Sequence, residues 1–459
     1  MKRITIYKKG IFLFPVILLL SLSVFSEEKN DIKPQIFSLK DVQEYAVRNS
    51  INVINSNLDL KIAKKKVWET TATGLPQING KVSYRDQLKI PTTLIPAKFM
   101  DPSAPDGEFF EMKFGTQHNA TFDITVSQLV FNGTYIVGLQ SAKIYKRISE
   151  ESLIKSKIEV KALVSQTYDM IIISESLRDI LEKNFKNLKV LYNEVKEMNK
   201  SGFVEDTDVD QIKLSLDELK NRISNMERQI EISYRLLKFQ MGMPLYDKIT
   251  LSDNLTSLIE RLKRSNIANE SFLPEMNINF KIAETAVKSS NMLLKKEKST
   301  FLPSLSAYFT YSKNAMRNDF SFLKKSGERW YPSIVAGLNL NFPIFSSGLR
   351  ASRVQQSKME LFKAINTRNE VKRGLELNYS KTLSNYKNAR NNSKTLGNSV
   401  KLAKRIYNKF LMKYKEGVSS SMDMIQAYNQ YLSVEINYRN SLIQLSNAEI
   451  ELEKVLNKM

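Results

Sequence analysis

The spacing of hydrophobic positions changes along the chain, and it first predicts long helices. Residues 139–201 contain no glycine or proline. Within them, apolar residues recur about every 3.5 positions, as at Leu177, Leu181 and Leu188. Heptad spacing of this kind is typical of long helices that pack as coiled coils. A helix over about 133–201 would be on the order of 100 Å long at 1.5 Å per residue.

Four other segments alternate apolar and polar residues, which predicts strands. Phe122, Ile124 and Val126 alternate with small polar residues, for example. The four predicted strands lie at about 76–90, 118–131, 303–313 and 330–345. Ten-residue segments with one apolar side and one polar side fit strands of a transmembrane barrel, and the alternative is an ordinary half-exposed sheet. The intervening segments 90–117 and 314–328 are expected to be long loops on the cell exterior.

The same short motifs occur in two copies along the chain, in the same order. Residues 73–78 (TGLPQI) recur as 300–305 (TFLPSL), and 129–133 (LVFNG) recur as 343–348 (PIFSSG). A glycine followed six residues later by aspartate also occurs twice, at Gly202 with Asp208 and at Gly417 with Asp423. The shared order predicts an internal repeat.

The repeat sets the expected domain boundaries. The first structural repeat is expected over 27–245, a linker or equatorial segment over 246–270, and the second structural repeat over 271–459. The second long helix is expected over about 348–416, where Gly374 and Gly397 would weaken it and favour a bend.

The first 26 residues have the pattern of a secretory signal peptide. Basic residues precede a mostly apolar run from Ile11 to Val24, and small residues follow it. We expect cleavage after Ser26, with a membrane anchor as the alternative. After residue 26 no stretch of about 18 apolar residues occurs, so entry into a membrane would require strands in a closed barrel.

Composition excludes several classes of function. The 459 residues include no cysteine and one histidine, which excludes disulfide scaffolds, thiol catalysis and zinc sites of cysteine and histidine. No catalytic group, metal site or cofactor is expected, and the protein is not expected to be an enzyme. His118 is expected to be a loop residue. The net charge is +21, yet basic residues are interleaved with acidic ones along helical faces, so nucleic acid is not expected as a partner.

Four strands per chain imply an oligomer. About eight strands is the smallest number that closes a barrel, so two copies would give a plugged barrel and three a twelve-stranded barrel with a lumen. The predicted helices are far longer than a bilayer is thick. The assembly is therefore expected to project a helical tube from the membrane and to act as a conduit.

Several ordered motifs carry a resemblance to a known family. They are residues 37–46 (FSLKDVQEYA) with Asn49, both Leu-Pro sites, residues 130–133 (VFNG) with their second copy, and residues 414–417 (YKEG) with Asp423. With them the chain resembles a TolC-family outer-membrane efflux protein over nearly its full mature length. The resemblance implies a mainly α protein with a transmembrane β-barrel. It further implies a homotrimer whose twelve-stranded barrel continues into a twelve-helix coiled-coil periplasmic tunnel.

The resemblance also implies a function and partners. The protein would be the outer-membrane channel of a tripartite efflux or export system, set in outer-membrane lipid with its tunnel in the periplasm. It would passively conduct substrates delivered by an inner-membrane pump of RND, ABC or MFS type and a periplasmic adaptor, or membrane fusion, protein. One alternative is an outer-membrane duct for type I protein secretion. From a different class, the alternative is a secreted coiled-coil scaffold or adhesin.

By the same resemblance, the two glycine-to-aspartate segments are the helical hairpin tips at the periplasmic end. Asp423 would line the pore, and Tyr414 and Asp208 would lie at contacts that keep the tip closed. For both aspartates, a favourable position at a helix N-terminus is the alternative explanation.

The expected adaptor surface comprises the two tip turns, Gly202-Phe203-Val204 and Gly417-Val418-Ser419. Burial against a neighbouring hairpin is the alternative for Phe203. Leu75, Pro76, Leu302 and Pro303 are expected at the junctions between helix and strand. The chain departs from the family pattern at Ser419, where an arginine can stand, and at Gln426, where a second acidic ring can occur.

Overall fold

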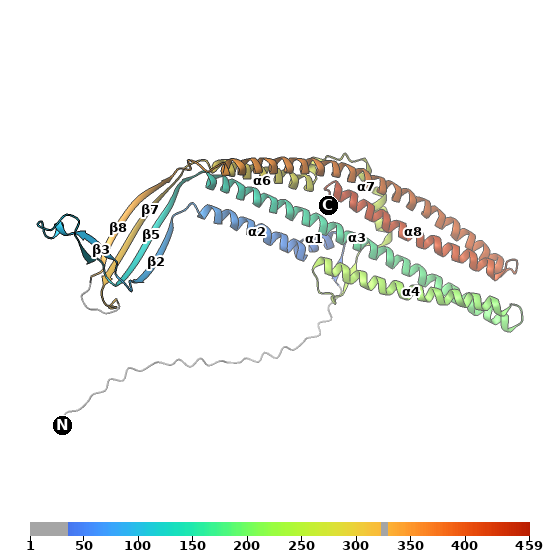
Figure 1. Cartoon of the computed structure of the whole chain (residues 1–459). Helices are drawn as coiled ribbons and strands as arrows, with labels where there is room; N and C mark the ends of the chain where they lie inside the picture. Colours follow the sequence, from blue (N-terminus) through green and yellow to red (C-terminus); the bar gives the residue numbers. More distant parts are fainter. Residues whose placement is uncertain (1–34, 323–328) are drawn as a thin grey trace, which may run out of the picture.

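The computed structural model describes residues 35–322 and 329–459, which form an elongated, curved molecule. A sheet occupies one end and helices run along the remaining length (Figure 1). The expected signal peptide, residues 1–26, lies outside the described residues.

The sheet contains four antiparallel strands in the order β2-β5-β7-β8. They are β2 (Gln77–Asp86), β5 (His118–Asn132), β7 (Ser304–Arg317) and β8 (Tyr331–Asn341). The central pair β5 and β7 joins the two halves of the chain, and β2 and β8 form the two outer edges.

The strand register gives the sheet one apolar and one polar face. Val82, Phe122 and Lys313 are cross-strand neighbours, and one row further along Gly80, Ile124, Tyr311 and Ile334 align. The apolar face is completed by Ile78, Tyr84, Val126, Phe309, Ala336, Leu338 and Leu340. On the opposite face, Thr125 and Thr310 hydroxyls lie 3.0 Å apart, and the Ser312 hydroxyl donates to Asp123 Oδ1 at 2.6 Å. The period-two pattern of the sequence therefore corresponds to two chemically distinct surfaces.

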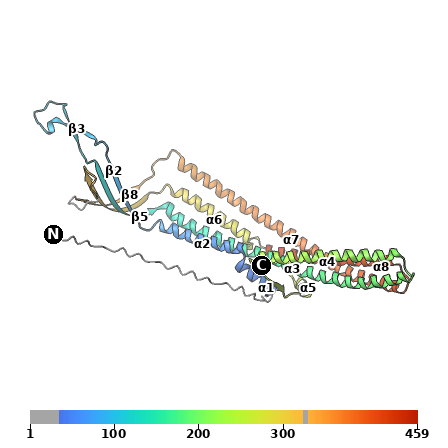
Figure 2. The same ribbon diagram turned by 90° about the horizontal axis from the view of Figure 1, so that it is seen from below.

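Two long helices follow the sheet, one directly after β5 and the other after residues 342–348 beyond β8. They are α3 (Gly133–Lys200) and α7 (Leu349–Lys415), and shorter helices pack beside them: α2 (Ile51–Ala72), α4 (Asp206–Met241), α6 (Ile278–Ser299) and α8 (Ser421–Val455). Helices α2 and α6 accompany the half near the sheet, and α4 and α8 the far half (Figure 2). Gly374 and Gly397 lie inside an unbroken α7. An added Cβ at Gly397 would approach the Tyr438 ring to 3.2 Å, so this glycine allows α7 and α8 to pack closely.

A belt of short elements surrounds the middle of the helices. Strand β1 (Gln35–Phe37) pairs in parallel with β6 (Ile249–Leu251), and α1 (Leu39–Asn49) and α5 (Leu255–Arg264) pack against α3. Single 3-10 turns follow at η2 (Ile267–Asn269) and η3 (Pro274–Met276). The buried Tyr168 hydroxyl donates to Asp253 Oδ2 at 2.7 Å, which ties α3 to this belt.

Two features of the sheet end differ from the sequence-based expectations. The proline-rich segment 90–117 was expected to be a loop, but it contains a hairpin of β3 (Thr92–Pro96) and β4 (Phe109–Lys113), with a 3-10 turn η1 (Ala97–Phe99) between them. His118 was expected in a loop, but it is the first residue of β5, and its Nδ1 lies 2.9 Å from the Tyr84 hydroxyl.

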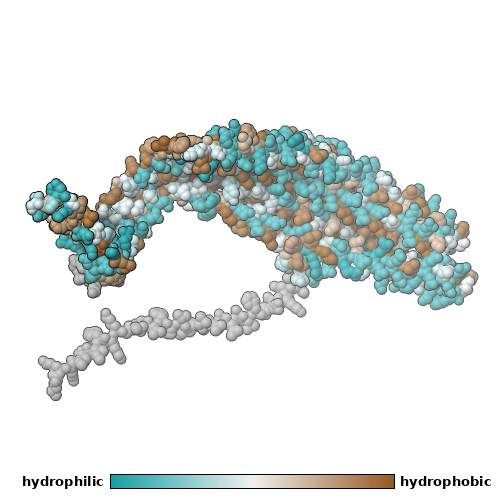
Figure 3. Space-filling model, in the orientation of Figure 1, coloured by the Kyte–Doolittle hydropathy of each residue, from teal (hydrophilic) through white to brown (hydrophobic). Residues whose placement is uncertain are grey.

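The surface divides by hydropathy along the molecule. Figure 3 shows hydrophobic residues gathered where the strands meet the helices, whereas hydrophilic residues cover most of the far helical end. No helix in the described part of the chain is long and apolar enough to cross a bilayer.

Two glycines with the same backbone conformation predict different stability effects. Gly242 and Gly202 have φ of 76° and 78°, so alanine at either costs about 1 kcal/mol of strain. At Gly242 an added Cβ would also lie 2.2 Å from the Asn49 carbonyl oxygen, whereas at Gly202 it meets nothing within 4 Å. We expect Gly242→Ala to lower the thermal unfolding midpoint, followed by circular dichroism, clearly more than Gly202→Ala. Equal losses would contradict the close packing of α1 on the end of α4.

Candidate functional site at the helical hairpin tips

The two hairpin tips end in the same backbone turn. After α3, the Gly202 N–H donates to the Asn199 carbonyl at 2.9 Å and the Phe203 N–H to the Met198 carbonyl at 3.0 Å. After α7, Gly417 and Val418 repeat both bonds at 3.0 and 2.8 Å. Both glycines adopt left-handed φ values, 78° and 73°, so each hairpin closes on a Schellman motif that favours glycine.

The turns expose apolar side chains at the same end of the molecule (Figure 1). Phe203 is 80% exposed and Val418 is 72% exposed. Val204 and Ser419 are half-buried, and Val204 packs against the apolar cluster shared by α3, α4 and α8. Within a single chain, Phe203 is therefore not buried against a neighbouring hairpin.

A hydrogen bond joins the two hairpins near their tips. The Ser421 hydroxyl at the start of α8 donates to Asp208 Oδ1 in the first turn of α4. Tyr414 packs against the same cluster, and its buried hydroxyl has no hydrogen-bond partner among the described residues. Burial raises the pKa of Tyr414, and the nearby carboxylates of Asp208 and Glu194 raise it further. The phenol therefore stays neutral beside the Asp208 carboxylate.

Asp423 caps helix α8. Its N–H donates to the Ser420 hydroxyl at 3.1 Å, and its carboxylate accepts from the Ser420 N–H at 3.3 Å, which is a capping box. The Ser419 hydroxyl donates to the same carboxylate at 3.2 Å. Hydrogen bonds from Ser420 and Ser419 lower the pKa of Asp423, so this exposed carboxylate is ionised at neutral pH. Asp423 therefore has a structural role at a helix N-terminus.

The helix-strand junctions lie at the other end of the same helices. Leu75 and Pro76 stand between α2 and β2, and Leu302 and Pro303 between α6 and β7. Next to the first junction, Gln128 Nε2 donates to the Gly74 carbonyl at 2.6 Å. A Cβ at Gly74 would lie 2.2 Å from the Tyr135 ring, so a larger residue here would require that ring to move; the second copy has Phe301 at this position.

Comparison with known proteins connects this architecture with a family. Residues 275–458 match the model of the family described as outer membrane efflux protein. No curated protein sequence matches the chain.

Solved structures of outer membrane channels have the same fold. The Campylobacter jejuni CmeC outer membrane channel is 19% identical, with a TM-score of 0.72 over 92% of this chain and 85% of that one. The Vibrio cholerae outer membrane protein VceC is 12% identical, with a TM-score of 0.68 over 91% and 95%. The open state of the Neisseria gonorrhoeae MtrE outer membrane channel is 16% identical, with a TM-score of 0.65 over 91% and 88%.

The second half of the chain thus matches the outer membrane efflux protein family in sequence, and the whole chain has the fold of outer membrane channels. The resemblance inferred from the sequence motifs is thus confirmed. Channels of this family are conduits rather than enzymes, in agreement with the expectation that this chain is not an enzyme. The described residues contain no group of three or more histidine or acidic side chains placed to hold a metal ion.

Two contacts at the hairpin tips were missed by the sequence reasoning. Ser421 bonds Asp208, and Asn199 Nδ2 donates to the Val204 carbonyl at 2.8 Å and to Asp206 Oδ1 at 2.9 Å. Neither follows a spacing rule, because the first joins residues far apart in sequence and the second crosses an irregular turn. An asparagine within the last helical turn, three residues before a glycine, was the one available signal for the second contact.

The bond between hairpins predicts a local change in dynamics. Ser421→Ala removes the hydroxyl that links α8 to Asp208, so amide hydrogen exchange should become several-fold faster in 199–212 and 412–425. Ser419→Ala is the matched control, because Ser419 bonds only within its own cap. Unchanged exchange in Ser421→Ala would show that this bond does not hold the hairpins together.

Proposed function

We propose that three copies of this chain form the outer-membrane channel of a tripartite efflux system. The observation that carries the proposal is the four-stranded sheet with one apolar face, one polar face and two edges, β2 and β8, that pair with no described strand. In lipid, unpaired backbone groups cost several kcal/mol each, which favours closure of the sheet by further copies. Three copies supply twelve strands around a lumen.

The length and number of the helices support a tunnel that continues from this barrel. The helices α3 and α7, of 68 and 67 residues, extend about 100 Å at 1.5 Å per residue, several times the thickness of a bilayer. With α4 and α8 each copy brings four helices to the far half, so a trimer brings twelve. We place the barrel in outer-membrane lipid and the helices in the periplasm.

The two halves of the chain support the proposed domain division. Among the described residues, 27–245 and 271–459 each provide two strands of the sheet, a long helix and a pair of shorter helices beside it, α2 with α4 and α6 with α8. Helix α1 and residues 246–270 contribute to the belt. A secreted coiled-coil scaffold would have no need of a sheet that is apolar on one face and open at both edges.

The proposed channel is passive. Substrate would arrive from an inner-membrane pump through a periplasmic adaptor and cross without chemistry. Purified protein in planar bilayers should give discrete conductance steps, and it should run as a heat-sensitive trimer on gels. A soluble monomer without conductance would overturn the proposal.

A ring of Asp423 carboxylates should influence ion flow in the trimer. Because three like charges around one axis attract cations, Asp423→Asn should lower cation preference and relieve block by divalent cations in single-channel recordings. Asp217→Asn is the matched control, since Asp217 is exposed on α4 and bonds Lys213 at 2.9 Å. If selectivity is the same in all three proteins, Asp423 has no pore role.

The exposed tip turns should bind the adaptor. Phe203→Asp places a charge where an apolar contact is proposed, so co-purification with the adaptor and efflux in cells should fall at least tenfold. Phe239→Asp is the matched control, because Phe239 is also an exposed phenylalanine (68%) but lies near the C-terminal end of α4, away from the tip. Normal efflux by the Phe203 variant would remove this turn from the adaptor surface.

A further inference from the structure

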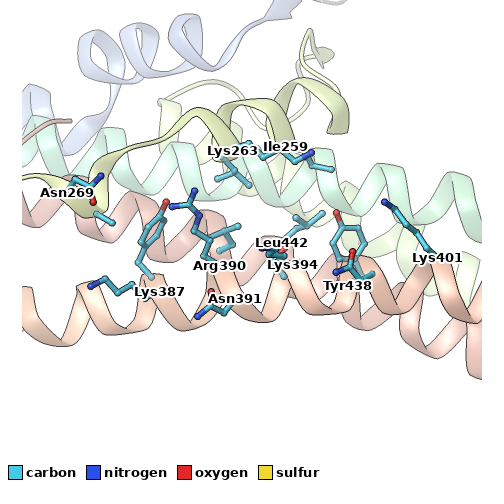
Figure 4. Close-up of a pocket in the computed structure, with 17 residues that line it drawn as sticks. Ile259, Lys263, Asn269, Lys387, Arg390, Asn391, Lys394, Lys401, Tyr438 and Leu442 are labelled. Atoms are coloured by element: carbon cyan, nitrogen blue, oxygen red, sulfur yellow. The ribbon is translucent and has the colours of Figure 1, made fainter.

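Helix α5 borders two cavities where the belt meets the long helices. One, of about 910 Å³, lies between α5, α7 and α8, where Figure 4 shows Arg390 of α7 projecting toward the segment that carries Lys263. The other, of about 280 Å³, lies between α1, α3, α5 and α8, and we call it the belt pocket. Leu258 and Leu262 anchor α5 and are 2% and 5% exposed. Because cavities border α5, its attachment to the long helices depends strongly on the side chains that line them.

A guanidinium and two buried carboxylates meet at the belt pocket. Arg261 of α5 donates to Asp169 Oδ2 of α3, and the Ser446 hydroxyl of α8 donates to the same oxygen. Glu449, three residues further along α8, lines the pocket. Asp169 and Glu449 are 1% and 5% exposed, so both carboxyl groups are removed from bulk water.

The two buried carboxyl groups are satisfied to different extents. One oxygen of each, Asp169 Oδ1 and Glu449 Oε2, has no hydrogen-bond partner among the described residues. Asp169 is compensated by the charge of Arg261, whereas Glu449 receives a hydrogen bond from the neutral Ser265. An ionised carboxylate that is buried without a paired charge is unfavourable. The geometry therefore favours negative charge on Asp169 and a proton on Glu449.

The charges that face Glu449 also oppose its ionisation. Arg261 is already bound to Asp169, and a third carboxyl group, Glu453, lies one turn further along α8. Burial raises the pKa of Glu449 to about 7; the hydrogen bond from Ser265 opposes this rise, and the Glu453 charge adds to it. The other titratable or charged groups around this site are Lys161 of α3, Asp253 before α5, Tyr386 and Arg390 of α7, and Lys458 and the terminal residue Met459.

We propose that the belt pocket is a proton-binding site that controls how firmly α5 is attached to α3 and α8. When Glu449 is protonated, Arg261 neutralises Asp169 alone and α5 stays attached. When Glu449 is ionised, two buried carboxylates repel each other and compete for one guanidinium, so water enters the pocket and α5 loosens. Because α5 is part of the belt, its protonation state changes how firmly the belt surrounds the middle of the helices.

The pH dependence of this attachment has a definite direction. The pKa of Glu449 is raised from the ordinary glutamate value of 4.5 to about 7. A group whose pKa is raised in the folded state binds its proton more tightly there, so it favours the folded contact at low pH. The attachment of α5 is therefore strongest below pH 4.5 and is lost as the pH rises through about 7.

Amide hydrogen exchange in the full-length oligomer tests this direction. After correction for the intrinsic effect of pH on exchange, residues 255–264 should exchange several-fold faster at about pH 8.5 than at about pH 5.5. Glu449→Gln keeps a neutral side chain of the same size, so exchange should stay slow at both pH values. Glu451→Gln is the matched control, because Glu451 is partly exposed on the same helix and bonds Lys454 at 2.8 Å. This control should keep the pH dependence of the natural protein.

Infrared difference spectroscopy identifies the group that holds the proton. A protonated carboxyl band should be present at about pH 5.5 and disappear as the pH rises through about 7. The band should be missing in Glu449→Gln and present in Glu451→Gln. A band that persists in Glu449→Gln would assign the proton to another carboxyl group and overturn the proposal.

The exchange data can also contradict the proposal. Exchange of 255–264 that does not depend on pH would overturn it, as would a pH dependence that is unchanged in Glu449→Gln. Unchanged circular dichroism and oligomer size in both variants exclude misfolding as the cause of a difference. These measurements report on the belt alone, so their result is independent of whether the protein conducts ions as a trimer.

Discussion

The open edges of the sheet are the constraint on which the rest of the structure depends. Strands β2 and β8 leave their outer backbone groups without partners within the described chain. In water such edges are exposed to unwanted pairing, and in lipid they are untenable, because no solvent satisfies them. Closure by copies of the same chain removes both problems. The proposed closure would turn the apolar face of the sheet outward and the polar face inward, and it would gather the helices joined to each strand.

One strand of the sheet runs directly into a long helix. Asn132 follows directly from β5 and caps α3, accepting bonds from the Thr134 and Tyr135 N–H groups at 2.9 and 3.1 Å. A strand therefore becomes a helix without an intervening loop. Both α3 and α7 end in matched Schellman turns at the distant hairpin tips.

Much of this fold could be predicted from the sequence, because hydrophobic residues recur at a clear helical or strand spacing along its long elements. Heptads from Leu177 onward predicted α3, and alternation at Phe122, Ile124 and Val126 predicted β5. The β3–β4 hairpin could not be predicted, because Pro91, Pro96 and Pro102 read as loop signals. Its strands are short, and proline is tolerated at edges. The pairing of β1 with β6 joins strands that lie far apart in sequence. Each has only three residues, which is too short to show an alternation of apolar and polar positions.

The candidate site was predictable to a smaller extent. Glycine followed by a first-turn aspartate located both tips and the capping box that includes Asp423. The bond from Ser421 to Asp208 depends on how two helices approach each other, which local sequence does not encode.

Cysteine cross-linking between sheet edges tests the central claim most directly. The chain contains no cysteine, so pairs placed along β2 and β8 report only on contacts between those strands. In the trimer, a series of β2 positions combined with Ser333→Cys should give oxidised bands of two and three chains and none larger. If no pair cross-links between chains, or if the ladder continues past three, the closed twelve-stranded assembly is wrong.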